Sequence, residues 1–345
     1  MTWMVYGANG YTGELVARLA VERGERPILA GRSSKVATLA AELGLRHRIF
    51  DLRNAEGGLA GVDTVAHCAG PFSATAEPMV DACIATGTHY LDVTGEIDVF
   101  EAIFARSGEA GRAGVVLLPG AGFDVVPSDC LAAMLSAALP TATHLKLAFI
   151  AGGGISGGTL RTTVEGAATG ARTRVSGQLV TVPVGHFSTT AHFPSGRRQV
   201  LSLPWGDVST AYRSTGIPNI TTYMGMPVPA GLISRGQRLF APIMRTSIAQ
   251  RVGKNLVGLV TGPGEKRRGN TRSEFWGEAR DSEGRTASAT LITPNTYSIT
   301  ADAVVRIATE IGTVKPGSHT PATAFGPDFV RGLDGVVVGP VTVTS

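Results

Sequence analysis

Cysteine is scarce in this 345-residue sequence, since Cys68, Cys83 and Cys130 are the only three and no Cys-x-x-Cys pair occurs. Three cysteines cannot all pair with one another, so the count is typical of a reduced chain and predicts a cytoplasmic location. His186 and His192 would share a face of one strand, but no third ligand accompanies them at metal spacing. We therefore predict no metal site.

Long apolar runs and strong charge are also missing. No uninterrupted apolar stretch approaches the roughly 18 residues of a membrane-spanning helix, and the first residues lack the basic and apolar segments of a secretory signal. The excess of 31 Lys and Arg over 27 Asp and Glu is small and dispersed. The sequence predicts neither a transmembrane segment nor a nucleic-acid partner, although its net charge of +4 allows anionic small ligands.

Glycine, by contrast, is abundant, with 45 of 345 residues. This is about 13%, against an average usage of roughly 7%. Glycine and proline together make up about 19%, below the roughly 25–30% that signals low-complexity disorder. With 43% apolar residues the chain can bury a large core. The length predicts two domains.

The first 140 residues alternate short apolar runs with helical patterns, which is typical of βαβ units on a parallel sheet. Helices are expected over Gly13–Arg23, Ser34–Leu43 and Met79–Ala85. The expected strands begin at Thr2, Pro27, Arg46, Thr64, Thr88 and Gly114. The predicted fold class is α/β, with an N-terminal Rossmann-type parallel sheet over residues 1–140.

The pattern changes after Pro140, where strand-like segments are separated by Gly and Pro turns. They predict a second, α+β domain on a mostly antiparallel sheet over residues 141–296. Residues 297–345 are expected to form a C-terminal helix, Ser298–Ile311, and a tail that pack back on the Rossmann domain. The expected strands are Leu145–Ile150, Arg174–Val182, Gln199–Leu203, Ser273–Ala279 and Thr286–Ile292.

A glycine loop follows the first strand and opens the first helix; its residues are Gly7, Ala8, Asn9, Gly10, Tyr11, Thr12 and Gly13. In this spacing the first glycine makes a tight turn, the second admits a pyrophosphate against the backbone, and the third packs the helix on the sheet. The helix N-terminus then presents amide hydrogens to the anion. The order strand, loop, helix favours a dinucleotide site over a purely structural turn.

The end of the second strand predicts which dinucleotide binds. NAD-binding chains usually place an acid there, but this sequence has Arg32, Ser33 and Lys35, which are donors suited to a 2′-phosphate. NADP(H) is therefore the expected cofactor, and a solvated turn charge is the alternative for Arg32. Asp51, after the third strand, either touches the adenine edge or caps the turn that follows it.

Small residues follow two further strands at the same edge. After the fourth strand, Ala69, Gly70 and Pro71 allow the backbone to skirt the cofactor, with a structural turn as the alternative. After the sixth strand, Gly120 and Gly122 suit close approach of the backbone to a ligand, and Phe123 follows them directly. We expect both segments to contact the cofactor.

Several of these motifs resemble a known family. They are Gly7–Gly13, Ala30–Arg32, Cys68–Phe72, Gly87–Glu96, Gly122–Asp129, Trp276–Ala279 and Thr320–Pro327. Together they resemble the saccharopine dehydrogenase-like NADP-binding family and are most similar to its actinobacterial branch of trans-acting enoyl reductases. The resemblance covers most of the chain. It implies reduction or formation of C=N bonds, as in some members, or reduction of C=C bonds, as in others.

The catalytic groups have to be sought among carboxylates and a tyrosine, because no tyrosine has a lysine four residues later and the short-chain dehydrogenase pair is therefore absent. Alternation along the fifth strand places Tyr90 and Asp92 on one side, with Tyr90 as a proton donor oriented by Asp92. The alternative is that Asp92, Thr94 and Glu96 cap the following helix.

Asp124 is the third catalytic candidate, and it is also expected to contact the nicotinamide carboxamide or the substrate. The alternative is that Asp124 or Ser128 caps the helix that begins near Pro127.

Two features of the second domain bear on the substrate. The run Gly152–Thr159 forms either a hinge between domains or an anion cradle. The stretch Leu232–Val260 is either a core helix with a solvated basic face, or an apolar channel wall for an acyl chain. In the second case Arg235, Arg238 and Arg245 would dock an acyl carrier protein or a membrane surface.

The sequence thus predicts an NADPH-dependent reductase acting on an activated double bond of a hydrophobic or acyl substrate. The resemblance favours an enoyl thioester from lipid or polyketide synthesis. A C=N reductase of the opine or imine type stays open, with Arg161, Arg172 and Arg174 as carboxylate ligands. So does an NADP-binding sensor or scaffold without turnover. A homodimer is compatible with each of these readings.

Overall fold

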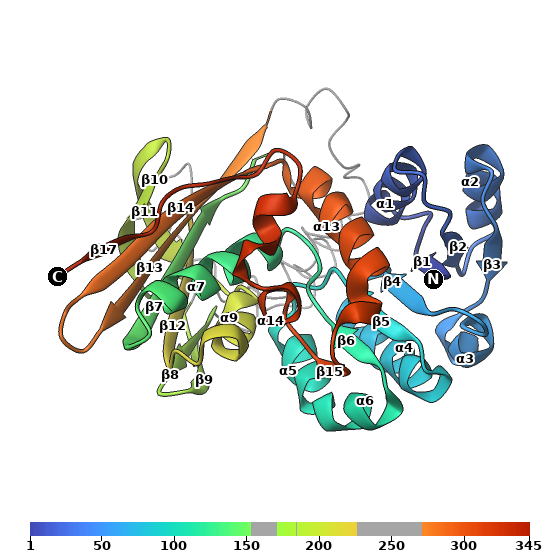
Figure 1. Ribbon diagram of the computed structural model, residues 1–345, viewed down its shortest axis with the longest axis horizontal. Helices are drawn as coiled ribbons and strands as arrows, with labels where there is room; N and C mark the ends of the chain where they lie inside the picture. The colour runs from blue at the N-terminus through green and yellow to red at the C-terminus, as the bar shows by residue number, and fades with distance from the viewer. Residues whose placement is uncertain (153–170, 184, 226–270) are drawn as a thin grey trace, which may run out of the picture. The chain divides into compact units, whose positions relative to one another are not determined.

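The computed structural model describes residues 1–152, 171–183, 185–225 and 271–345, and the chain divides into two compact units. The first unit comprises Met1–Val126 and Tyr297–Asp334, and the second comprises Pro127–Thr296 and Gly335–Ser345. The first unit thus ends before the expected residue 140, and the last residues of the chain group with the second unit. Each unit is built around its own sheet (Figure 1).

The sheet of the first unit is parallel throughout, and its strand order is β15-β6-β5-β4-β1-β2-β3. Its strands are β1 (Trp3–Tyr6), β2 (Ile28–Gly31), β3 (His47–Ile49), β4 (Thr64–His67), β5 (His89–Asp92), β6 (Val116–Leu118) and β15 (Gly317–Ser318). The first six begin within two residues of the expected positions. β1, β2 and β4 are buried along their whole length, as expected of strands covered on both faces.

Helices cover both faces of this sheet (Figure 1). They are α1 (Tyr11–Glu22), α2 (Lys35–Leu43), α3 (Ala55–Gly58), α4 (Phe72–Thr86), α5 (Ile97–Ala105), α6 (Ser107–Ala113), α13 (Thr296–Glu310) and α14 (Pro321–Phe325). Short 3₁₀ turns lie at Leu52–Asn54, Ile311–Thr313 and Pro327–Gly332. Met79 and Cys83 of α4 pack in one apolar cluster with Met4 and Val65 of the strands. α4 begins seven residues before the expected Met79, and Pro78 lies inside it.

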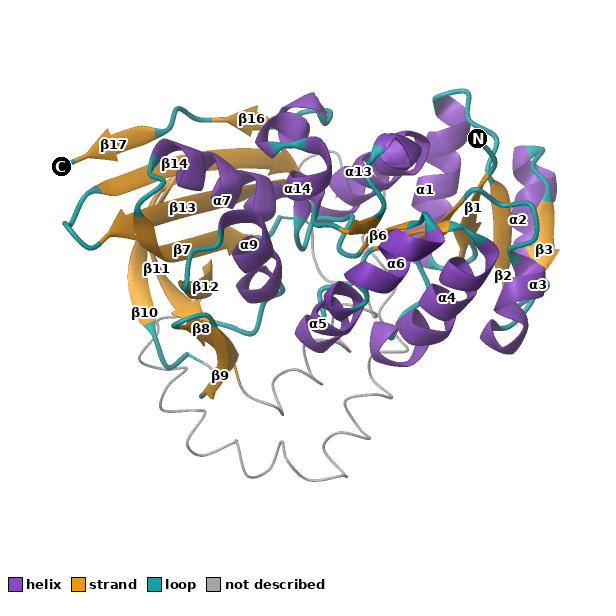
Figure 2. Ribbon diagram, turned by 60° about the horizontal axis from the view of Figure 1, so that its bottom comes forward, coloured by secondary structure: helices purple, strands orange, loops and turns teal. Residues whose placement is uncertain are grey.

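The sheet of the second unit is mostly antiparallel, in the order β10-β11-β12-β7-β13-β14-β16, with one parallel pair between β7 and β12. Its strands are β7 (Ala142–Ile150), β8 (Ala171–Val175), β9 (Gln178–Val182), β10 (Ser188–Phe193), β11 (Gly196–Ser202), β12 (Asn219–Gly225), β13 (Arg272–Asp281), β14 (Thr286–Pro294), β16 (Val337–Val338) and β17 (Thr342–Thr344). Figure 2 shows α7 (Val126–Ala138) and α9 (Asp207–Thr215) on one face of it. The predicted α/β class with a second, mostly antiparallel domain is confirmed.

One expected strand of the second unit was wrong. The segment Arg174–Val182 is not continuous, because it contains the turn of the β8–β9 hairpin. Ser176 and Gly177 at this turn both have positive φ, +48° and +80°. Two central residues with positive φ match the twist of the flanking strands and close a two-residue hairpin. Because the first turn position is a serine and not a residue typical of such turns, the sequence pattern did not predict a turn here.

Some expectations concern residues outside the described ranges. The glycine run beyond Gly152, Arg161, and the whole stretch Leu232–Val260 with its arginines belong to this part of the chain. Among the residues that the structure does describe, no helix has the length and apolar character needed to cross a bilayer.

Candidate cofactor and catalytic site

The predicted site residues gather at one edge of the parallel sheet. The chain runs outward from β1 to β2 and β3 and then returns to β4, which pairs with the other side of β1. Loops after β1 and β4 therefore diverge. In such sheets, ligands bind beyond the strand ends at the place where the strand order reverses, which is called the switch point. All the predicted cofactor ligands and catalytic candidates follow β1 to β6 at this carboxyl edge or, like Tyr90 and Asp92, lie on the last strand residues.

The glycine loop, Gly7–Gly13, is held tightly against its neighbours. The amides of Gly7 and Ala8 both donate to the Ala30 carbonyl, at 2.8 and 3.1 Å. A Cβ atom on Gly13 would lie 2.4 Å from the Gly7 carbonyl oxygen, and one on Gly7 would lie 2.9 Å from the Ala69 Cβ. No side chain fits in either place, so the backbone at the switch point is kept bare and within reach of a ligand.

The first turn of α1 is left without a side-chain cap. Its N-cap residue is Gly10, which forms no side-chain hydrogen bond. Since the first turn of a helix carries amide hydrogens with no partner in the helix and a partial positive charge, this terminus suits an anion. The glycine loop thus ends in a place where a pyrophosphate would be stabilised.

The first turn of α4, by contrast, is capped from within the protein. The Glu96 carboxylate accepts hydrogen bonds from the amides of Phe72 and Ser73, both at 2.9 Å. The sequence offered Glu96, as one alternative, as a cap of the helix that follows it. For its carboxylate this alternative is wrong, because Glu96 is the N-cap residue of α5 but forms no side-chain cap there. The N-cap residue of α1, Gly10, has no such side-chain cap.

The end of β2 carries positive charge and no acid. Arg32 and Lys35 are exposed, and the Ser33 hydroxyl accepts from the Lys35 amide at 3.2 Å. A Cβ on Gly31 would lie 3.1 Å from the Asn9 Oδ1, so Asn9 of the glycine loop lies beside this strand end. The structure thus places Asn9 of the glycine loop near the expected 2′-phosphate ligands.

Asp51 caps the turn that follows β3. Its carboxylate accepts from the Arg53 amide at 3.0 Å and pairs with the Arg53 guanidinium at 2.7 Å. The hydrogen bonds from Arg53 hold the pKa of Asp51 below its usual range, against the opposing effect of burial. Of the two roles expected for Asp51 the capping role is observed, and contact with adenine stays a prediction.

Tyr90 and Asp92 lie on the same side of β5, as alternation predicts, and both are buried. The Tyr90 hydroxyl donates to Asp92 Oδ2 at 2.6 Å, while Asp92 Oδ1 accepts from the amides of Thr94 and Gly120, each at 2.9 Å. Burial raises the pKa of Asp92 to about 6, and these hydrogen bonds oppose the rise. The pair ties the end of β5 to the loop after β6.

Asp124 is the partly exposed carboxyl among the three catalytic candidates. A Cβ on Gly95 would lie 2.8 Å from its Oδ2, so the loops after β5 and β6 enclose it. Burial raises the pKa of Asp124 to about 7. The neighbouring Phe123 amide donates to the Thr300 hydroxyl at 3.0 Å, which fixes the Gly122–Asp124 segment on α13. The site therefore holds a carboxyl group that changes protonation near neutral pH.

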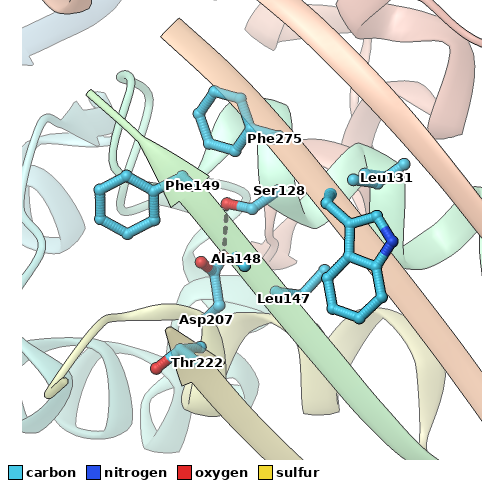
Figure 3. A pocket seen from close by; sticks show the side chains of 9 residues that line it. Ser128, Leu131, Leu147, Ala148, Phe149, Asp207, Thr222 and Phe275 are labelled. Carbon is cyan, nitrogen blue, oxygen red and sulfur yellow. Dashed lines mark hydrogen bonds between the residues drawn. The ribbon is translucent and has the colours of Figure 1, made fainter. Parts of the chain in front are cut away.

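Ser128 and Asp129 belong to a different arrangement, inside the second unit. The Ser128 hydroxyl donates to Asp207 at 2.8 Å, and the Ser214 hydroxyl donates to Asp129 (Figure 3 shows the first contact). The gap beside them, of about 200 Å³, is lined mainly by apolar side chains of α7, β7 and β13 and is too narrow to hold a water molecule. These residues therefore join α7 to α9.

Arg174 is also engaged within the second unit. Its guanidinium donates to the carbonyls of Val208 and Gly177, both at 2.7 Å, and lies 4.2 Å from the centre of the Tyr212 ring. These contacts occupy the group that would bind a substrate carboxylate. The expectation that Arg174 serves as such a ligand is corrected accordingly.

Comparisons with known proteins agree with the fold and the glycine loop. Residues 3–118 match the family model described as the saccharopine dehydrogenase NADP binding domain. The fold is shared with apo saccharopine dehydrogenase (L-Glu forming) from Saccharomyces cerevisiae, with a TM-score of 0.64 and 13% identity over the whole of both chains.

Two kinds of curated relatives match part of the chain. A saccharopine dehydrogenase-like oxidoreductase of Rattus norvegicus is 31% identical over 156 residues, covering 36% of this chain and 35% of the relative. A trans-acting enoyl reductase of Mycobacterium leprae is 35% identical over 143 residues, covering 36% and 33%. A putative trans-acting enoyl reductase of Mycobacterium tuberculosis is 33% identical with the same coverage. The match spans about a third of the relatives' length. Residues 3–118 are thus similar to the NADP-binding domain of the family that the motifs resemble.

Proposed function

We propose that this protein is an NADPH-dependent oxidoreductase that delivers hydride to an activated double bond, most specifically the C=C bond of an enoyl thioester or a related lipid or polyketide intermediate. The observation that carries the proposal is the carboxyl edge of β1 and β2. There an uncapped helix terminus follows a loop with no room for side chains, and two exposed cations stand where an NAD site would have an acid.

Each part of this edge has a role toward the dinucleotide. When bound, NADPH supplies the hydride. The first turn of α1 holds the pyrophosphate, and Arg32 and Lys35 bind the 2′-phosphate with charge-assisted hydrogen bonds. The segments Ala69–Pro71 and Gly122–Asp124 lie along the same edge, where they would border the nicotinamide of a bound cofactor.

Asp124 supplies the proton that balances the hydride. Reduction of a polarised double bond adds a hydride at one end and a proton at the other, so a donor is needed near the acceptor. Burial raises the pKa of Asp124 to about 7, which keeps a large part of it protonated at neutral pH. Tyr90 stays protonated because its hydroxyl is buried and faces the Asp92 carboxylate. We assign Tyr90 and Asp92 to positioning of the loop that bears Asp124.

A second candidate is reduction of a C=N bond, as in saccharopine- or opine-type enzymes. The names of the saccharopine dehydrogenase-like relatives favour it. This candidate would use Arg161, Arg172 and Arg174 to bind a substrate carboxylate. Arg174 instead donates hydrogen bonds to backbone carbonyls of the second unit, which counts against that role for it. An NADP-binding scaffold without turnover is the remaining alternative.

Further details of the proposal rest on the sequence alone. Docking of an acyl carrier protein or a membrane surface concerns Leu232–Val260, outside the described residues. A cytoplasmic location rests on the small number of cysteines, none of which forms a disulfide. A homodimer remains a proposal as well.

The test begins with titration of the purified protein with NADPH and NADH, followed by NADPH consumption with crotonyl-type thioesters and, separately, with cyclic imines. Tight NADPH binding and thioester-dependent consumption are the expected results. Activity only on imines would favour the second candidate. Binding without turnover on either substrate would favour the scaffold, and binding no tighter than millimolar would remove the central claim.

A further inference from the structure

His67 is a fully buried polar residue at the end of β4, directly before the loop that we name the β4 turn, residues Cys68–Pro71. Three aromatic rings surround its imidazole. The ring centres of Tyr6, Phe72 and Tyr90 lie 5.5, 5.4 and 6.1 Å away. Sequence reasoning did not single out His67, because it closes an apolar run that predicts an ordinary strand.

The imidazole contacts one hydroxyl, that of Thr75 in the first turn of α4. The Thr75 Oγ1 lies 3.1 Å from His67 Nε2, 2.7 Å from the Ala69 carbonyl and 3.0 Å from the Pro71 carbonyl. A hydroxyl has one hydrogen, and the two carbonyls can only accept. The hydroxyl therefore donates to the carbonyls, and His67 Nε2 carries the hydrogen that it donates to Thr75.

The number of hydrogens shared by Thr75 Oγ1 and its three partners fixes the tautomer of His67. With the hydrogen on Nε2, the Nδ1 atom keeps a bare lone pair, and within the described part of the chain no partner lies within hydrogen-bond distance of it. Burial also lowers the pKa of His67 to about 3, so the ring stays neutral over the physiological range. A buried acceptor without a partner is costly. The hydrogen bond of Nε2 is therefore the polar contact that the ring makes within the described part of the chain.

What the Nε2 hydrogen does is hold the β4 turn. Through Thr75 it orders the carbonyls of Ala69 and Pro71, which are predicted cofactor contacts. Ala69 in turn lies against Gly7, where an added Cβ would be 2.9 Å from the Ala69 amide nitrogen. The turn is also joined to β1 by the Cys68 amide, which donates to the Tyr6 carbonyl at 2.8 Å. A small movement of the turn would therefore alter the space beside the glycine loop.

We propose that His67 and Thr75 form a buried clamp that fixes the β4 turn against the glycine loop, and that His67 is a positioning residue for the dinucleotide. This inference rests on the proposed NADPH binding. Glu96 fixes the outer side of the same helix start through the amides of Phe72 and Ser73, so the clamp and Glu96 hold the turn from two directions.

The variants that test the clamp are His67→Phe, Thr75→Val and His67→Gln. The phenylalanine keeps an aromatic ring but no donor, the valine has the shape of threonine without its hydroxyl, and glutamine places an amide donor near the position of Nε2. Thr86→Val is the matched control, because Thr86 lies at the other end of α4 and bonds to Ala82 and Thr88 instead.

The NADPH dissociation constant and the melting temperature are measured for each variant. We expect His67→Phe and Thr75→Val each to weaken NADPH binding roughly tenfold, and the double variant to bind no worse than either alone. His67→Gln should recover most of the affinity, and Thr86→Val should bind like the wild type. In the wild type, the nitrogen chemical shifts of labelled histidine should show the neutral Nε2–H tautomer between about pH 5 and pH 8.

Outcomes against the clamp are distinct from outcomes against the proposed function. Wild-type affinity in folded His67→Phe and Thr75→Val would overturn the clamp and leave NADPH binding intact. Losses that multiply in the double variant would show two separate effects and count against a shared device. An Nδ1–H tautomer would contradict the hydrogen count. Failure of the wild type itself to bind NADPH would overturn the proposed function, and the cofactor role of the clamp with it.

Discussion

At the scale of single residues, we expect Arg32 to determine the choice of cofactor. It is exposed at the end of β2, where no carboxylate competes for its guanidinium in the sequence from Ala30 to Lys35. We expect Arg32→Ala to weaken NADPH binding by roughly 10- to 100-fold, because one charge-assisted hydrogen bond is worth roughly 1.5–3 kcal/mol. NADH binding should be unchanged. Fluorescence titration with both nucleotides measures the two effects.

Arg18→Ala is the control for this prediction. Arg18 lies on α1 and pairs with Glu14 and Glu42, both at 2.8 Å. Loss of an exposed ion pair has little effect, so the variant should bind both nucleotides normally. A preference for NADPH that survives in Arg32→Ala would remove Arg32 from the 2′-phosphate site.

Asp124 predicts how activity depends on pH. A proton donor has to be protonated, and burial raises its pKa to about 7, so kcat/KM should fall as the pH rises through that value. Asp124→Asn should lose this limb of the profile and reduce turnover by roughly 10²- to 10⁴-fold. Steady-state rates from pH 5 to pH 9 check it; an unchanged limb in the variant would assign the titration to another group.

The same carboxyl also makes the stability of the fold depend on pH. Its pKa is higher in the folded protein than in an unfolded chain, where it is near 3.9. Folding therefore becomes less favourable as the pH rises from about 4 to about 7, and the cost persists at higher pH. Asp124→Asn should accordingly melt at a higher temperature than the wild type at pH 8. A variant that is more stable but turns over more slowly would show that the stability lost by burying the Asp124 carboxyl is needed for activity.

At the scale of elements, the close approach of the glycine loop to α1 leaves no room for a side chain. In Gly13→Ala the new Cβ would meet the Gly7 carbonyl at 2.4 Å, so the loop has to move. Such overpacking costs roughly 1–3 kcal/mol, and the displaced amides would no longer face the pyrophosphate. We expect at least a roughly tenfold loss of NADPH affinity.

Gly332→Ala is the matched substitution, because no atom lies within 4 Å of the position of its Cβ. It should leave NADPH affinity unchanged. Isothermal titration compares the two variants, with circular dichroism to verify their folding. Normal affinity in a folded Gly13→Ala protein would mean that the glycine loop is not the pyrophosphate site.

At the scale of the whole molecule, an ion-pair network joins parts of the first unit that are far apart in the sequence. Asp302 of α13 is buried and binds Arg23 and Arg306, both at 2.6 Å, while Asp334 joins the same two arginines. Although burial acts in the opposite direction, the hydrogen bonds from Arg23, the Asp334 amide and Arg306 hold the pKa of Asp302 below its usual range. Its contribution to stability is therefore present above about pH 4 and lost as the pH falls through the lowered value.

Asp302→Asn should lower the free energy of unfolding at neutral pH by about 2 kcal/mol or more, since it leaves two arginines partly buried without their shared carboxylate. Asp328→Asn, which removes an exposed pair with Arg331, should cost less than about 0.5 kcal/mol. Urea unfolding at pH 7 compares them. Equal losses in the two variants would show that the network has no special role.

The sequence predicted those features that follow from local periodicity. The strand beginnings came from short apolar runs, and the shared side of Tyr90 and Asp92 came from alternation along the strand. The hydrogen bond between these two side chains agrees with the second prediction. The order of the strands in the sheet was not among these predictions. The contacts of Arg32 and Asp124 with a ligand remain predictions.

Long-range contacts could not be predicted in this way. The Glu96 carboxylate reaches amides more than twenty residues earlier in the chain, because β4 and β5 are neighbours in the sheet. Local offsets pointed to the following helix instead. The same limit applies to His67 and Arg174. His67 contacts Thr75 and Arg174 donates to Val208, and no local pattern in the sequence predicts either partner.

The interrupted course of the first unit has a consequence for how the protein is made. β15 completes the parallel sheet beside β6, yet its residues, Gly317 and Ser318, are translated only after every strand from β7 to β14. An N-terminal region that emerges first from the ribosome therefore waits with an unpaired strand edge, a feature that invites aggregation. Residues 1–126 alone make a poor expression fragment, and chaperones should bind the nascent chain until translation has passed Ser318.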